Sequence, residues 1–183
     1  MKRGIVSIVL VAILASIPCL PALAQDTGII TITMTGVSEI SIILEPTEWP
    51  IGDVASDTEH ETQPQIEWCT LTNTGNVDVD TFIVGEDAEW VDNHGAYKWT
   101  LSSDGTNGEH TYGLWFRISG DTTRGYVPIT KEESEFWPPP DVVDKSIAVN
   151  NHKQFGLRLL TPTSFHAGRQ MQTHIIISAV AAS

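Results

Sequence analysis

The sequence predicts an all-β fold built as a two-sheet antiparallel sandwich, with about nine strands and no substantial helix. Apolar and polar residues alternate with a period of two along most of the chain, and turn residues recur at fairly regular spacing. No stretch beyond residue 24 has the period of an amphipathic helix. These observations are typical of immunoglobulin-like or jelly-roll sandwiches, but the Cys…Trp…Cys spacing of true immunoglobulin domains is absent, so only the architecture follows.

The first 24 residues have the composition of a secretory signal peptide. Lys2 and Arg3 form a basic start, Ile5 to Ile17 form an apolar stretch of 13 residues, and Pro21 to Ala24 (PALA) supply a small-residue cleavage motif. The apolar stretch is too short to span a membrane. A lipoprotein alternative would attach lipid to Cys19, but the proline before it does not suit that motif.

Cleavage would leave residues 25–183 as a single domain large enough for a hydrophobic core. It removes two of the ten basic residues and none of the 23 acidic ones, so the formal charge changes from −13 to −15. Such a surface repels nucleic acid and anionic membranes. It favours cations or a saline habitat, although an ordinary exported protein explains it more simply. No later stretch predicts a transmembrane anchor, so we expect a secreted protein, extracellular or at the cell surface.

Cys69 is the one cysteine beyond the predicted cleavage site, so an intramolecular disulfide is not expected. A lone cysteine in an exported protein is either a buried small apolar residue or an intermolecular crosslink.

The alternation places the strands along the chain. They are expected at 28–35, 37–46, 66–72, 77–84, 97–103, 111–119, 146–150, 153–162 and 173–182. The polar segment DGTNGEH (Asp104 to His110) predicts a hairpin between its two flanking strands. Residues 52–65 and 120–144 are expected to be long loops. The WPPP motif (Trp137 to Pro140) in the second loop is either a stiffened connection or a polyproline recognition segment.

The segment GIITITMT (Gly28 to Thr35) sets Ile30, Ile32 and Met34 on one face of a strand and threonines on the other. It has no charge and no proline, which is typical of a segment that pairs with another strand. It is predicted to be either the first strand of its own sheet or a donor strand for a neighbour. In a single chain we expect it to pair with its own sheet, because its isoleucines otherwise stay exposed.

No catalytic site is expected. The chain lacks a Gly-x-Ser-x-Gly motif and the signature of a thiol protease, and HETQP (His60 to Pro64) lacks the second histidine of a metalloprotease helix. The many acidic residues do not single out a glycosidase-type pair of carboxylates. Six histidines are expected to be single solvated residues: 60, 94, 110, 152, 166 and 174. No cofactor is predicted.

Calcium is the one metal that the composition suggests. Asp104, Asn107 and Glu109 lie in one loop and offer the oxygen ligands that calcium prefers. A second acidic group occupies residues 86–89. Neither has the spacing of an EF-hand, and a plain turn or a solvated loop explains each of them.

The stretch YGLWFRI places Tyr112, Leu114 and Phe116 on one face of a strand and Trp115 with Arg117 on the other. If the first face is core, Trp115 points outward. An outward tryptophan can stack on a sugar ring, bury itself against a neighbouring subunit, or lie under a loop such as 120–144.

The segment LTNTGNVDVDTFIV (residues 71–84) resembles the strand–turn–strand of many exported prokaryotic immunoglobulin-like domains, and residues 155–179 resemble their closing strands. Together with a signal peptide and an N-terminal strand, this order resembles the filament subunits of the TasA/camelysin type and their archaeal bundling-pilus relatives. The resemblance implies that one subunit inserts its N-terminal strand into the next, and it implies no active site.

Two functions are therefore expected. The first is a secreted, non-catalytic structural subunit of an extracellular filament, surface layer or biofilm matrix that self-associates into a homopolymer by β-strand addition. The alternative is a secreted carbohydrate-binding sandwich that presents exposed tryptophans to a polysaccharide.

Overall fold

The computed structural model describes residues 31–64, 66–93, 95–121, 125–136 and 146–183. Those residues contain twelve strands and no helix, which confirms the all-β class. The chain divides into two units, residues 1–36 and residues 37–183, and all twelve strands belong to the second. The predicted signal peptide, residues 25–30 and the WPPP motif lie outside the described residues.

The larger sheet has nine strands. Its main path runs through β1 (Ile42–Glu45), β3 (Cys69–Asn73), β10 (His152–Leu160), β7 (Thr111–Ile118), β6 (Lys98–Leu101), β5 (Ala88–Trp90) and β11 (Met171–Gln172). Two short strands lie off this path: β2 (Glu59–Glu61) pairs with β10, and β8 (Val127–Pro128) pairs with β7. Strands far apart in sequence are thus neighbours, as in a sandwich.

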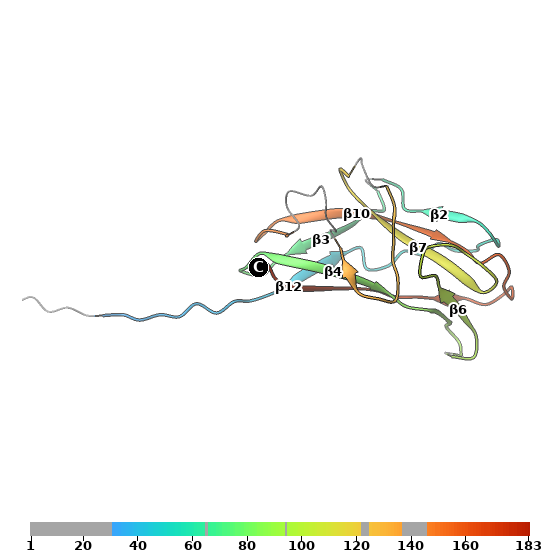
Figure 1. Cartoon of the computed structure of the whole chain (residues 1–183), viewed down its shortest axis with the longest axis horizontal. Helices are drawn as coiled ribbons and strands as arrows, with labels where there is room; N and C mark the ends of the chain where they lie inside the picture. Colours follow the sequence, from blue (N-terminus) through green and yellow to red (C-terminus); the bar gives the residue numbers. More distant parts are fainter. Residues whose placement is uncertain (1–30, 65, 94, 122–124, 137–145) are drawn as a thin grey trace, which may run out of the picture. The chain divides into compact units, whose positions relative to one another are not determined.

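The smaller sheet has three strands in the order β12 (Ile175–Ala181), β4 (Val79–Gly85) and β9 (Ser134–Glu135). Strands β12 and β4 are antiparallel and lie side by side over seven residues, from the pair Ile175 and Gly85 to the pair Ala181 and Val79 (Figure 1). The final strand of the chain therefore lies at one margin of this sheet.

One core joins the two sheets. Strands β3 and β4 alternate strictly between buried and half-buried residues, which is the period that the sequence predicts. Phe136, just after β9, packs against Phe116 of β7 at a centroid distance of 4.9 Å and against Phe155 of β10 at 4.7 Å. These aromatic contacts link the small sheet to the large one, which supports a sandwich-like arrangement.

The predicted hairpin around Asp104 to His110 is wrong. Strands β6 and β7 pair in parallel, with Thr100 opposite Thr111 and Leu101 opposite Tyr112. The connection is nine residues long, which lets the chain reverse twice, whereas a two-residue turn would impose an antiparallel pair. The Thr100 N–H donates to the His110 carbonyl at 2.7 Å, which closes the returning loop.

Other segments also differ from their expected structure. The expected loop 120–144 contains the short strands β8 and β9. The expected loop 52–65 contains β2, whose sequence Glu-His-Glu lacks the apolar residues by which a strand is recognised. Only Ile147 of the expected strand 146–150 pairs, in an isolated bridge to Val79. The expected strand 37–46 is regular only in β1, because residues 37–41 are held by side-chain and backbone bonds to a turn instead of by a strand ladder.

Candidate assembly interface

The outer edge of β12 carries backbone groups with no partner among the described residues. The Glu86 N–H donates to the His174 carbonyl, and the Ala182 N–H donates to the Asp78 carbonyl. An antiparallel ladder alternates its bonded pairs, so the even-numbered residues of β12 bond to β4. The N–H and C=O groups of Ile175, Ile177, Ala179 and Ala181 consequently point away from β4.

Among the outer strands of the described sheets, β12 alone is both long and unprotected. Strands β1, β2 and β9 each contain glutamate, β8 contains Pro128, and β11 has only two residues. Charge, proline and short length are the devices that stop sheet edges from pairing with other chains. The seven residues of β12, IIISAVA, have no charge and no proline. This edge is therefore open to strand addition.

Side chains along β12 leave the adjacent core incompletely covered. Ile175, Ile177 and Ala179 pack against the core but are only half-buried. On the opposite face, Ile176 and Val180 are 48% and 46% exposed. One more strand beside β12 would bury apolar surface on both faces, in addition to satisfying the backbone groups of the edge.

The N-terminal segment is apolar and exposed where the structure describes it. Ile32 is 74% exposed and Met34 is 85% exposed, and residues 31–35 belong to no strand. The expectation that this segment forms a strand in its own sheet is therefore wrong for these residues, and the first strand of the domain is β1. Ile30 and the start of the predicted donor strand lie outside the described residues. A donor role for the segment remains a prediction.

Residues 37–41 are tied to the turn that follows β3. The Asn76 side chain accepts a hydrogen bond from the Glu39 N–H at 2.7 Å and donates to the Val37 carbonyl at 2.9 Å. The Thr74 N–H donates to the Ser41 carbonyl at 2.9 Å. The turn Asn73–Asn76 between β3 and β4 thus also anchors the chain that leads into β1.

Trp115 does not present an open ring. Tyr112, Leu114 and Phe116 are buried on the core face, as predicted, and Trp115 is half-buried on the other. Its indole packs on the backbone of Gly105 and Gly113 so closely that a Cβ at either position would collide with it. The Arg158 guanidinium lies over the same ring, 4.5 Å from its centroid, and 4.5 Å from the Tyr126 ring. Arg117 is exposed.

Replacing Trp115 with alanine is therefore expected to destabilise the domain by roughly 2 kcal/mol, because it removes a packed indole and leaves a cavity under Arg158. Urea unfolding followed by circular dichroism measures this change. The matched control is Arg117→Ala on the same strand, which should change stability by less than about 0.5 kcal/mol. If both variants unfold like the parent, the indole is a free platform and our description of its packing is wrong.

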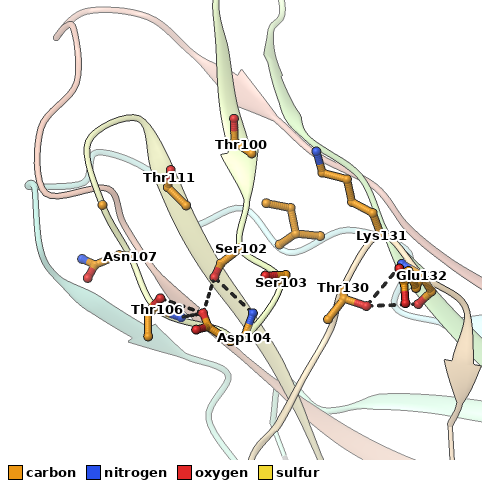
Figure 2. Close-up of a pocket in the computed structure, with 12 residues that line it drawn as sticks. Thr100, Ser102, Ser103, Asp104, Thr106, Asn107, Thr111, Thr130, Lys131 and Glu132 are labelled. Atoms are coloured by element: carbon orange, nitrogen blue, oxygen red, sulfur yellow. Dashed lines mark hydrogen bonds between the residues drawn. The ribbon is translucent and has the colours of Figure 1, made fainter.

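Two of the three calcium candidates, Asp104 and Asn107, form side-chain hydrogen bonds with other parts of the chain. Asp104 Oδ1 accepts hydrogen bonds from the Thr106 hydroxyl at 2.6 Å, the Thr106 N–H at 2.9 Å and the Ser102 hydroxyl at 2.8 Å (Figure 2). These bonds, that of the Thr106 hydroxyl first, lower the Asp104 pKa to about 2. Asn107 donates to Asp57 and to the Thr161 carbonyl, both at 2.8 Å. Asp104 therefore acts as a turn cap.

An open pocket of about 690 Å³ lies beside this turn. Figure 2 shows Asp104 with its hydroxyl partners at one end and Thr130, Lys131 and Glu132 at the other. Lys131 forms an ion pair with Asp87 at 2.6 Å. The lining contains no histidine and no aromatic residue. Across the described parts of the chain, no three His, Cys, Asp or Glu side chains are grouped to hold a metal ion.

Two other predictions concern single residues. Cys69 is buried, and burial raises the pKa of its thiol, so it is the small apolar residue of the two alternatives and not an accessible crosslink. The histidines are not all isolated, because the rings of His110 and His166 lie 5.7 Å apart beside Tyr97. Their distance in sequence gave no sign of this grouping.

No protein-family model, curated protein or solved structure matches this chain. No helix among the described residues has the length and hydropathy needed to cross a lipid bilayer.

Proposed function

We propose that the chain is an exported, non-catalytic structural subunit that forms a homopolymer by β-strand addition. In this assembly, residues 28–35 of one copy pair with the outer edge of β12 in the next copy. One observation carries the proposal: the same chain contains both halves of a strand pairing. The outer edge of β12 is uncharged and has no partner among the described residues, and the N-terminal segment is apolar, exposed and of strand composition.

The two elements are complementary in length and chemistry. The edge strand has seven residues, and the N-terminal segment offers eight, of which residues 30–35 alternate between apolar side chains and threonine. Its apolar face would lie beside Ile175, Ile177 and Ala179, where the core is incompletely covered. Burial of Ile32 and Met34 contributes about 1.5–3 kcal/mol each. Backbone bonds add affinity, and the alternation sets the register.

Export is part of the same proposal, since it rests on the signal-like composition of residues 1–24. A polymer held by strand pairing needs no disulfide, and the buried Cys69 offers none. An extracellular filament or surface layer is the class of assembly that this interface supports, because each subunit supplies one donor and one acceptor. Head-to-tail contacts of this kind extend into a filament when the rotation between copies does not close a ring.

Deletion of residues 28–35 from the chain that begins at Gln25 is expected to yield a monomer, whereas the undeleted chain should form oligomers that grow with concentration. Sedimentation velocity and negative-stain microscopy measure the difference. A monomeric undeleted chain at millimolar concentration contradicts the proposal. A matched pair sharpens it: Ile32→Lys places a charge on the apolar face and should block growth, whereas Thr33→Lys, on the opposite face, should permit it.

A further inference from the structure

A second arginine is held between two aromatic rings, at a place distant in sequence from Trp115. The Arg169 Cζ lies 4.4 Å from the centroid of the Trp90 ring and 5.0 Å from that of Tyr97. Trp90 belongs to β5, and Arg169 precedes β11. These two strands pair with Met171 opposite Trp90, and the Val91 N–H donates to the Gln170 carbonyl at 3.0 Å. The ladder therefore fixes the backbone on both sides of the guanidinium.

Arg158 provides an internal comparison. Its guanidinium also lies between two rings, Trp115 and Tyr126, but its Nη1 is 3.5 Å from Glu59 Oε2. The charge of Arg158 is thus neutralised within the fold. No hydrogen bond or ion pair joins the Arg169 side chain to any other described residue, and Arg169 is exposed. The aromatic contacts position its planar set of N–H donors, which have no acceptor among the residues that the structure describes.

Two imidazoles extend the same cluster. The His166 ring lies 5.1 Å from the Tyr97 ring, and the His110 ring lies 5.4 Å from it. The His166 backbone N–H donates to the Tyr97 hydroxyl at 3.0 Å, and that hydroxyl lies 2.9 Å from His110 Nδ1. Glu109 Oε1 lies 3.9 Å from His110 Nε2, and the Glu109 side chain is 78% exposed.

We propose that Arg169, with Trp90, Tyr97 and His166, binds the carboxylate of a uronic acid residue in an acidic polysaccharide. A guanidinium presented edge-on matches a carboxylate with two parallel hydrogen bonds. The neighbouring His166 imidazole and Glu109 carboxylate supply the mixture of donors and acceptors that sugar hydroxyls require. A protein carboxylate would need only the cation, so these extra polar groups favour a polyhydroxylated ligand. The ring contacts hold the guanidinium in place and reduce the entropy lost on binding.

The site does not include β12, so this inference goes beyond assembly. Its test does not depend on whether the chain assembles. It also differs from a Trp115 platform, whose ring is already covered by Arg158. The acidic surface of the chain disfavours an anionic polymer overall, so binding depends on the local charge of Arg169, which has no acceptor among the described residues.

Calorimetric titration of the chain from Gln25 with galacturonate and mannuronate hexamers tests the site. Binding to at least one hexamer is expected, with affinity at least tenfold weaker for the methyl-esterified form, which has the same sugars without the charge. Arg169→Gln should weaken binding by tenfold or more, whereas Arg117→Gln, which removes an equal charge from an exposed strand position, should leave it unchanged. Circular dichroism confirms that both variants are folded.

Equal binding of the methyl ester, unchanged affinity in Arg169→Gln, or no binding of either hexamer up to millimolar concentration each overturns the proposal. If Arg169→Gln lowers the sedimentation coefficient of the assembled chain and leaves hexamer binding intact, the carboxylate comes from a second copy of the protein, which also overturns it. Loss of assembly in the donor deletion has no bearing on any of these outcomes.

Discussion

Replacing Ala179 with proline is expected to prevent assembly and leave the monomer folded. The Ala179 N–H points away from β4, so a proline there removes a donor from the outer edge without breaking the ladder inside the sheet. Proline is tolerated on edge strands where its missing N–H faces outward. An incoming strand would meet a gap in the row of donors and the bulk of the ring. Sedimentation velocity should show a monomer at concentrations at which the parent chain polymerises.

The neighbouring position supplies the matched control. The N–H of Ser178 points toward β4, opposite Phe82, so Ser178→Pro removes a bond inside the sheet. That variant is expected to lose about 3 kcal/mol of stability, whereas Ala179→Pro should lose much less. Urea unfolding separates the two effects. Polymers of normal length from folded Ala179→Pro would contradict the assignment of the β12 edge as the acceptor. In that case the N-terminal deletion would still identify the donor segment, but the acceptor would lie elsewhere on the chain.

The period-two pattern was sufficient to predict the all-β class because it reflects local chemistry. Strands β4 and β7 bury the residues that the alternation selects, among them Ile83 and Phe116. Pairing partners are a different matter, since they depend on contacts between distant segments. The parallel pairing of β6 with β7 is an example: the loop residues favour a turn, but the long connection permits a second reversal that the alternation does not encode.

The same distinction explains what could be predicted of the candidate interface. The strand-like composition of residues 28–35 is a local property and was visible in the sequence. The acceptor edge was not visible, because the sequence of the final strand shows its composition but does not show that only one of its edges pairs with β4. The pairs formed by Arg158 with Trp115 and by Arg169 with Trp90 likewise join residues more than forty positions apart. Their contacts exist only once the sheet order is established.

Replacing Asn73 with alanine is expected to destabilise the domain by about 3 kcal/mol. Asn73 is fully buried at the end of β3, where the chain crosses from the large sheet to the small one. Its side-chain amide donates to the Val77 carbonyl at 2.8 Å and to the Ile147 carbonyl at 2.9 Å, and its oxygen accepts from the Gly75 N–H at 3.0 Å. Alanine removes these three hydrogen bonds, each of which contributes roughly 1 kcal/mol. The Gly75 N–H still has the Ser41 carbonyl at 3.2 Å, and the Ile147 carbonyl still accepts from the Val79 N–H at 3.1 Å.

The free energy of unfolding in urea measures this loss, and Asn76→Ala is the control. Asn76 is exposed and binds the Val37 and Glu39 backbone, which water can solvate after the substitution, so the control should lose less than about 1 kcal/mol. A small effect of Asn73→Ala would show that water replaces its bonds and that the turn is not fixed by this side chain. If the large effect is observed, one buried amide holds both the crossing between the sheets and the turn that anchors residues 37–41, immediately after the proposed donor segment.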